Sequence, residues 1–313
     1  MKAVVFSDGA VSWAERPDPE PGPHDLLVRV AAAGLNGADI LQKGGRYPPP
    51  RGVPADQPGL ECAGTVEATG RAVESYKPGD QVMGLLAGTG QAELALLDER
   101  VAMPVPEACS LAEGGGFPEV FSTAYDALFP QAGLSMGERV LVTGAAGGVG
   151  TAAVQLAVAC GASVVASVRD PQLHERVASL GATAAAPDEA PDHGPYDVVL
   201  ELVGGPNLPD DLASLAPQGR VIVIGIGAGS KTTVDLAALM HARATVRGST
   251  LRSRAPEEKA LLARQLERHV LPSLGLGRIK VVTTATYPFA AAEEAYDRFE
   301  KGHKFGKIIL TSS

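Results

Sequence analysis

Glycine is concentrated in one short stretch of the chain, the sequence GAAGGVG at residues 144–150. Gly144, Gly147 and Gly150 are spaced three apart, and Gly148 adds a fourth glycine between them. In such a loop the first glycine makes a tight turn, the middle ones let the backbone approach an anion, and the last lets a helix pack on a strand. We therefore predict that this loop, including Ala146 and Val149, binds the phosphates of a dinucleotide. An ordinary strand–turn–helix is the alternative, because the spacing departs from G-x-G-x-x-G.

The segments around the loop predict the elements that position it. Apolar residues 140–142 end just before it, and an alanine-rich segment without proline follows it. A helix that begins there would present unpaired N–H groups and the positive end of its dipole to a pyrophosphate. The same rhythm continues, with strands expected at 139–143, 163–168, 197–203, 219–225 and 244–249 and helices at 149–160, 172–180, 208–215, 235–241 and 256–270. This alternation predicts an α/β fold with a doubly wound parallel sheet of the Rossmann type.

The remaining parts of the chain predict a β-rich unit. Residues 1–118 contain short apolar runs separated by proline- and glycine-rich turns, such as those at 17–23 and 44–50. Many short strands at this spacing are typical of a barrel. The last forty residues return to strands, expected at 279–284 and 307–310, around a helix expected at 290–301. We predict a β-rich domain of residues 1–120 and 272–313, with a nucleotide-binding domain of residues 121–271 inserted in it.

Composition limits the partners and the compartment. The chain has 27 lysines and arginines against 36 aspartates and glutamates, a net charge of −9, which argues against a nucleic acid or an anionic membrane as partner. The three cysteines are far apart and form no C-x-x-C pair, as expected for reduced thiols in the cytoplasm. No signal peptide and no apolar run near eighteen residues is found, so we expect no membrane span.

Five segments of the sequence resemble one family. They are AGLNGAD at 33–39, PGLECAG at 58–64, YKPGDQV at 76–82, AAGGVG at 145–150 and KFGKII at 304–309. In this order they resemble the medium-chain dehydrogenase/reductase superfamily, and specifically its zinc-free quinone oxidoreductase branch, which includes zeta-crystallin. Residues 45–50, 118–128 and 248–254 are similar to the tumour-suppressor-inducible quinone oxidoreductases. The resemblance implies a GroES-like catalytic domain, an inserted Rossmann domain, a nicotinamide cofactor and a homodimer.

The resemblance also assigns residues to the nicotinamide end of the cofactor: Thr123, Ile224, Gly225, Ser249, Thr250, Leu251 and Lys307. Thr123 would meet the nicotinamide, or instead bond its own helix backbone. The glycines that follow Ile224 would let the backbone pass beside the ring, or simply end a strand. Lys307 would reach the cofactor, or be an exposed edge charge that limits strand pairing.

The choice of cofactor depends on the end of the second Rossmann strand. Arg169 would pair with the 2′-phosphate of NADPH, whereas an acidic residue such as Asp170 would bind the ribose hydroxyls of NADH. Ser167 and Arg169 together resemble the pattern of NADPH-using relatives, and Asp170 is also placed to cap the helix that Pro171 begins. We therefore expect NADPH, with a solvated charge at Arg169 as the alternative.

Zinc is not expected, and this shapes the predicted chemistry. Zinc-dependent relatives place a cysteine where Asn36 stands and a histidine where Leu60 stands, so the ligands for a tetrahedral site are missing. Without a Lewis acid, acceptors that take hydride readily are favoured. Asn36 and Tyr47 are then the candidates to donate a hydrogen bond to the acceptor oxygen, or else a helix cap and a loop aromatic. We expect Glu61 to be buried and structural. Arg252 and Arg254 are expected to be exposed charges, with a place at the entrance of the cleft as the alternative.

These inferences predict an NADPH-dependent, zinc-independent quinone oxidoreductase. One alternative is a 2-enoyl reductase of the same fold. Another is a non-catalytic nucleotide-binding protein, as the lens crystallins of this family illustrate.

Overall fold

The computed structural model describes residues 1–312, which form two compact units. The first unit is Met1–Ser122 with Leu251–Ser313, and the second is Thr123–Thr250. Among residues 1–312, no helix is long and apolar enough to cross a membrane.

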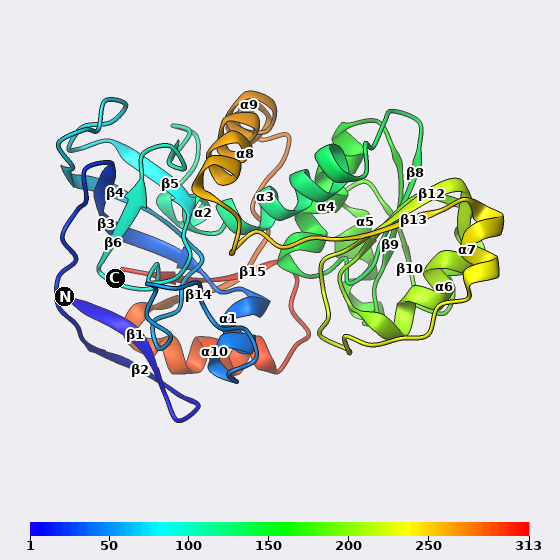
Figure 1. Cartoon of the computed structure of the whole chain (residues 1–313), viewed down its shortest axis with the longest axis horizontal. Helices are drawn as coiled ribbons and strands as arrows, with labels where there is room; N and C mark the ends of the chain where they lie inside the picture. Colours follow the sequence, from blue (N-terminus) through cyan, green and yellow to red (C-terminus); the bar gives the residue numbers. More distant parts are fainter. Residues whose placement is uncertain (313) are drawn as a thin grey trace. The chain divides into compact units, whose positions relative to one another are not determined.

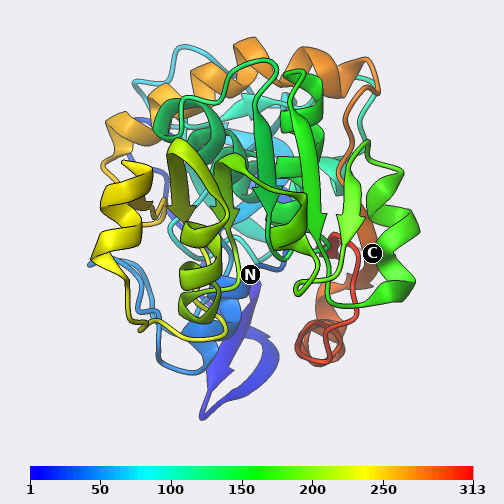
Figure 2. The ribbon, with the colours of Figure 1, turned by 90° about the vertical axis from the view of Figure 1, so that its right-hand side faces the viewer.

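The second unit is built on a six-stranded, fully parallel sheet (Figure 1). Its strands are β8 (Arg139–Val142), β9 (Ser163–Ser167), β10 (Thr183–Ala185), β11 (Tyr196–Glu201), β12 (Leu215–Val223) and β13 (Thr245–Gly248). They lie in the order β10-β9-β8-β11-β12-β13, side by side in Figure 2. Numbered within the unit, this order is 3-2-1-4-5-6, that of a dinucleotide-binding Rossmann sheet. The predicted fold class is confirmed.

Helices connect these strands at nearly the predicted places. They are α4 (Gly148–Ala159), α5 (His174–Ala178), α6 (Leu208–Ala213) and α7 (Leu236–Ala242), while α3 (Pro118–Asp126) leads into the unit. Short side chains let α4 bury most of its length. The chain order reverses between β8 and β11, so the loop that follows β8 lies at the switch point of the sheet, where nucleotides bind in such folds.

The first unit contains a mixed sheet in the order β14-β15-β3-β4-β5-β7, with β6 also paired to β3. The strands are β3 (Asp25–Gly34), β4 (Glu61–Thr69), β5 (Gln81–Leu85), β6 (Leu94–Asp98), β7 (Met103–Pro104), β14 (Thr283–Pro288) and β15 (Lys307–Thr311). Only β14 and β15 pair in parallel. The end of the chain thus returns to the start, since β15 pairs with β3 beside it in Figure 1.

A hairpin and five helices complete the first unit. They are β1 (Lys2–Ser7), β2 (Ala10–Glu15), α1 (Gly37–Lys43), α2 (Leu111–Gly115), α8 (Pro256–His269), α9 (Leu271–Gly275) and α10 (Ala292–Glu300). In the core, the rings of Phe6 and Tyr296 meet edge to face with centroids 5.5 Å apart. This geometry adds to the stabilisation from burial of the two rings.

Helix α8 marks a difference from the predicted domain boundary at residue 271. Residues 251–271 belong to the first unit rather than to the nucleotide-binding one. The helix buries Leu262, Ala263 and Leu266, and Arg264 donates a hydrogen bond to the carbonyl of Ala102. The strand–helix alternation continues through this helix, but its apolar face packs on the β-rich unit.

Candidate active site

The glycine loop after β8 gives two of its glycines distinct geometric tasks. Gly144 adopts a φ of +57°, a left-handed turn that favours glycine. A Cβ on Gly150 would lie 2.6 Å from the carbonyl oxygen of Gly144, so only glycine lets α4 pack this closely. The N–H groups of Gly148, Val149 and Gly150 belong to the first turn of α4, which has no earlier turn to bond. The loop therefore offers donors at a helix N-terminus, as an anion requires.

The end of β9 lies next to this loop. The N–H of Ala145 donates to the carbonyl of Ser167 at 3.2 Å, and the Ser167 side chain is buried. Arg169 is exposed. The carboxylate of Asp170 accepts a hydrogen bond from the N–H of Gln172 at 3.0 Å and caps the short helical turn that Pro171 begins. The alternative role considered for Asp170, a helix cap, is the one found.

The other predicted cofactor residues of the second unit also lie at the carboxyl edge of its sheet. The N–H groups of Ile224 and Gly225 donate to the carbonyl of Glu201 at 2.9 and 3.1 Å. A Cβ on Gly225 would lie 2.0 Å from the carbonyl oxygen of Leu202, so this close approach requires glycine. Parallel strands end at one edge, and the structure therefore gathers these backbone segments where the loop after β8 lies.

Ser249 and Thr250 directly follow β13, whereas Thr123 lies on α3. Ser249 donates its N–H to the carbonyl of Val223, and its hydroxyl accepts a hydrogen bond from Gln131 at 2.6 Å. Gln131 also donates to Asp126 of α3. Thr123 is buried on the same helix, 8% exposed. Gln131 thus ties α3 to the end of β13.

In the first unit, Asn36, Glu61 and Lys307 form one buried cluster. The Lys307 ammonium donates to Glu61 Oε1 at 2.6 Å, to Asn36 Oδ1 at 2.7 Å and to the Leu35 carbonyl at 2.9 Å. The side chains of Lys307 and Glu61 are 3% and 0% exposed. Lys307 is therefore not the exposed edge charge considered above, and its three hydrogens are all engaged within the first unit. Glu61 is buried, as predicted.

Asn36 stands at the N-cap position of α1, but its side chain serves the cluster. Its amide donates to Glu61 Oε1 at 2.9 Å and to the Gly34 carbonyl at 3.3 Å, so both amide hydrogens are used. Its backbone N–H donates to Asp39 at 2.8 Å. Burial raises the pKa of Asp39 to about 6, although the hydrogen bonds from the N–H groups of Asn36 and Gly59 and the charge of Lys307 oppose the shift. The side chain of Asn36 thus bonds to both members of the buried ion pair, Glu61 and Lys307.

Tyr47 is held by Arg252, a residue that the sequence predicts to be exposed. Arg252 is 5% exposed, which contradicts the expectation for it. Its guanidinium donates to the carbonyls of Ala87 and Tyr47, at 2.7 and 3.2 Å, and to Gln42 Oε1 at 2.7 Å. It also lies 5.4 Å from the centroid of the Tyr47 ring, a cation–π contact. The phenol hydroxyl takes no part in these contacts.

Glu119 is a second residue that the sequence analysis missed. It lies in the first turn of α3, half-buried, and its N–H donates to Glu61 Oε2 at 2.8 Å. Burial, and next the charge of Glu61, raise the pKa of Glu119 to about 8. Glu119 in turn raises the pKa of the half-buried Tyr47, after the larger effect of burial. No local pattern marks Glu119, because its environment comes from partners distant in sequence.

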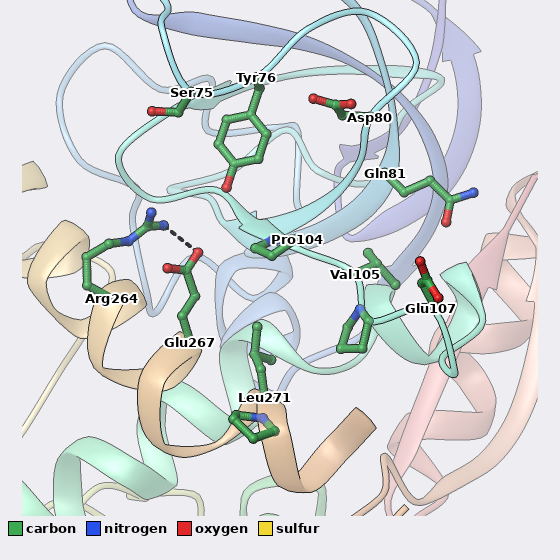
Figure 3. Close-up of a pocket in the computed structure, with 12 residues that line it drawn as sticks. Ser75, Tyr76, Asp80, Gln81, Pro104, Val105, Glu107, Arg264, Glu267 and Leu271 are labelled. Carbon is green, nitrogen blue, oxygen red and sulfur yellow. Dashed lines mark ion pairs between the residues drawn. The ribbon is translucent and has the colours of Figure 1, made fainter. Parts of the chain in front are cut away.

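One surface hollow of the first unit contains none of the predicted site residues. It measures about 860 Å³ and is lined by residues that include Tyr76, Val105 and Leu271. Figure 3 shows the ion pair at its side, in which Arg264 lies 2.9 Å from Glu267.

Comparison with known proteins agrees with this fold along the chain. Residues 22–134 match the family model described as "Alcohol dehydrogenase GroES-like domain", and residues 148–267 match "Zinc-binding dehydrogenase". The quinone oxidoreductase of Rattus norvegicus is 31% identical over 306 residues, which cover 93% of this chain and 90% of the relative.

Solved structures of similar proteins cover the whole chain. An NAD-dependent alcohol dehydrogenase superposes with a TM-score of 0.87 at 27% identity, and covers 100% of both chains. The CurK enoyl reductase superposes with a TM-score of 0.85 at 27% identity, and covers 100% of this chain and 99% of that one. Fold and matches together define a nicotinamide-dependent oxidoreductase. The chain belongs to the medium-chain dehydrogenase/reductase superfamily, within its quinone oxidoreductase branch.

Proposed function

We propose that this chain reduces quinones, or similarly activated acceptors, by hydride transfer from NADPH without a metal ion. The observation that carries the proposal is the Lys307 ammonium, which lies 2.6 Å from the buried carboxylate of Glu61. The position beside this carboxylate, next to Asn36, already holds a cation. An enzyme built in this way favours acceptors that need no Lewis acid.

The residues around Asn36 do not fit zinc. Zinc takes cysteine, histidine or carboxylate ligands in a tetrahedral arrangement. Here the neighbours are an amide, a carboxylate that already accepts from Lys307 and Asn36, and the buried aliphatic side chain of Leu60. Among residues 1–312, no group of three or more histidine, cysteine, aspartate or glutamate side chains could hold a metal.

Two features of the β9 end support NADPH over NADH. Asp170 uses its carboxylate to cap the following turn, which reduces its availability for ribose hydroxyls. Arg169 is exposed and can pair with a 2′-phosphate by charge-assisted hydrogen bonds. The glycine loop with Ala146, and the first turn of α4, would hold the pyrophosphate.

In this proposal the protein binds and orients, and the nicotinamide, when bound, supplies the hydride. The backbone at Ile224 and Gly225, with Thr123, Ser249, Thr250 and Leu251, would surround the nicotinamide end. Tyr47 would donate its phenol hydrogen to the acceptor oxygen as negative charge grows there. Asn36 and Lys307 keep their buried contacts with Glu61 and position the acceptor side of the site indirectly.

The test is oxidation of NADPH with 1,4-naphthoquinone or phenanthrenequinone, followed by the loss of NADPH absorbance. We expect turnover that survives dialysis against a chelator, and tighter binding of NADPH than of NADH by fluorescence titration. Loss of activity on chelation that zinc restores would contradict the metal-free assignment.

A second candidate, a 2-enoyl reductase, is favoured by the likeness to the CurK enoyl reductase. Comparing turnover of a crotonyl thioester with that of quinones separates the two activities. A non-catalytic nucleotide-binding role would be indicated instead if NADPH bound tightly while neither acceptor class was reduced.

The proposal includes a homodimer in the cytoplasm. Strand β13 forms one edge of the parallel sheet, and its residues are exposed. Cys62, Cys109 and Cys160 are free thiols, as a reducing compartment maintains. The quinone or enone is the partner of the site, and neither a nucleic acid nor a membrane is proposed.

A further inference from the structure

Arg252 joins segments of the first unit that lie far apart in the sequence. Its guanidinium donates to the Ala87 carbonyl and to Gln42 Oε1, both at 2.7 Å, and to the Tyr47 carbonyl at 3.2 Å. Each of its three nitrogens therefore has an acceptor of its own, and the residue is only 5% exposed. A planar guanidinium with acceptors in three directions restrains its neighbours more closely than a single ammonium can.

Gln42 extends these contacts to the other end of the Tyr47 loop, residues 47–55. Its side-chain amide accepts from Arg252 through Oε1 and donates to the Ala55 carbonyl at 2.8 Å. Between Tyr47 and Ala55 the chain contains four prolines, at 48, 49, 50 and 54, whose rings fix the backbone angle φ. Both ends of the Tyr47 loop are thus bonded to one network, and its interior has little conformational freedom.

The ring of Tyr47 is restrained by the same guanidinium. The Cζ atom of Arg252 lies over this ring, 5.4 Å from the centroid, and covers one of its faces. These contacts involve the carbonyl and the ring of Tyr47 and leave its hydroxyl out. Arg252 therefore fixes the backbone and the ring of Tyr47 without engaging the group that would donate to an acceptor.

Arg252 is itself anchored to packed elements of the first unit. The Lys259 ammonium donates to the Arg252 carbonyl at 2.7 Å. Lys259 lies near the start of α8, which buries Leu262 and Leu266. The preceding residue, Leu251, is 6% exposed. The position of Arg252 is therefore set independently of the Tyr47 loop.

We propose that Arg252 is a positioning residue for the acceptor, which holds the Tyr47 loop and the Tyr47 ring in place before the acceptor binds. The inference rests on the proposed quinone reduction, with Tyr47 as the hydrogen-bond donor. A donor that is already in place needs no reorganisation as charge grows on the acceptor oxygen. Without Arg252 the loop would have to be ordered in each catalytic cycle, and the cost of this ordering would reduce the stabilisation of the transition state.

The first test measures the Tyr47 loop by trypsin cleavage between Arg51 and Gly52, which are both exposed. We expect Arg252→Met to be cleaved there at least about tenfold faster than wild type, because cleavage follows the population of the open loop. Mass spectrometry of the fragments gives the rate at this bond. Arg278→Met, a change at an exposed arginine of the same unit, is the matched control and should be cleaved after Arg51 at the wild-type rate. Equal rates for wild type and Arg252→Met would overturn the proposal.

The second test is a double-mutant cycle in naphthoquinone reduction. We expect Arg252→Met to lower kcat/KM at least about tenfold, while the NADPH affinity measured by fluorescence is unchanged. Arg252→Lys keeps the charge but not the three-way hydrogen bonding, so its kcat/KM should lie between those of wild type and Arg252→Met. In a Tyr47→Phe background, which lacks the phenol hydroxyl, Arg252→Met should lower kcat/KM by less than about threefold, because the group that Arg252 positions is already gone.

Equal losses of kcat/KM from Arg252→Met in the two backgrounds would show that Arg252 does not act through Tyr47, and the inference would fail. A Tyr47→Phe variant with wild-type kcat/KM would have the same consequence and leave quinone reduction intact. If circular dichroism shows that Arg252→Met is unfolded, Arg252→Lys replaces it in both tests, and wild-type behaviour of that variant overturns the proposal. A wild-type protein that reduces no quinone overturns both proposals.

Discussion

Gly147 and Gly150 differ in what a side chain would meet. A Cβ on Gly147 would lie 3.4 Å from the Gly144 carbonyl oxygen, an ordinary contact, and the backbone there is extended with a φ of −74°. A Cβ on Gly150 would lie 2.6 Å from backbone atoms. A side chain at Gly147 would therefore obstruct a bound anion, whereas a side chain at Gly150 would obstruct packing of the helix.

This separation predicts opposite outcomes for two substitutions. Gly147→Val should fold with nearly wild-type stability but bind NADPH at least about tenfold more weakly, since a loss of 1.4 kcal/mol corresponds to tenfold in affinity. Gly150→Val should unfold at lower denaturant concentration, because overpacking typically costs about 1–3 kcal/mol. Urea titration and NADPH fluorescence measure both. Unchanged NADPH affinity in a folded Gly147→Val would exclude this loop as the phosphate site.

The charged residues of the first unit show where prediction from single residues ends. The sequence is compatible with an exposed charge at both Arg252 and Lys307, yet the two residues are at most 5% exposed. Their acceptors lie far along the chain, at Gln42 and Tyr47 for Arg252 and at Asn36 and Glu61 for Lys307. A buried charge is tolerated only with such partners, and no local pattern reveals them.

At the scale of elements, a pair of carboxyl groups joins α6 to the end of β11. Glu201 accepts hydrogen bonds from the N–H groups of Val203 and Gly204, at 2.5 and 2.6 Å, so its Oε1 is engaged as an acceptor. Asp211 is 4% exposed, and its Oδ2 finds no donor among the described residues. Burial, and next the charge of Glu201, raise the pKa of Asp211. A proton held by Asp211 between the two groups satisfies both.

This pair predicts how stability depends on pH. In the unfolded chain Asp211 loses its proton near pH 4, whereas in the folded chain it keeps the proton to higher pH, so the free energy of unfolding falls as pH rises between these values. Asp211→Asn removes this loss and can donate to Glu201. We expect Asp211→Asn to exceed wild type at pH 8 by at least about 1.4 kcal/mol, the equivalent of one pKa unit.

Urea unfolding at pH 5 and pH 8 measures this difference, and Asp210→Asn is the matched control. Asp210 is the exposed neighbour of Asp211 on α6. Equal changes in stability from pH 5 to pH 8 for wild type and Asp211→Asn would show that the two carboxyls share no proton.

The elements themselves were largely predictable from the alternation of apolar runs and turns. Helix α4 was expected at 149–160 and spans Gly148–Ala159, and β9 was expected at 163–168 and spans Ser163–Ser167. Strand β10 was missed because its three residues, Thr183–Ala185, carry no β-branched run. A strand expected at 279–284 begins later, as β14 (Thr283–Pro288). The apolar residues Ile279 and Val281 are buried, as in a strand, but they lie outside any strand.

At the scale of the whole molecule, the order of elements predicted the fold class but not where α8 packs. Nothing in the strand–helix rhythm distinguishes a helix that covers a parallel sheet from one that covers a barrel. The deciding contacts are long-range, such as that between Arg264 and Ala102. The division of the chain between its two units therefore required the structure.

The exposed edge of the second unit predicts how two copies associate. Strand β13 lies at one end of the strand order, and Val246 of this strand and Leu236 and Met240 of α7 are 39%, 67% and 76% exposed. An unprotected edge with apolar neighbours favours pairing with another strand.

We expect a mass in solution of twice the 32.1 kDa of one chain, measured by light scattering, and a monomer for the double variant Met240→Glu and Val246→Glu. Met136→Glu, which changes an 81% exposed methionine of the loop before β8, should remain a dimer. If the double variant stays dimeric, another surface joins the two copies, and a monomeric wild type would contradict the predicted association.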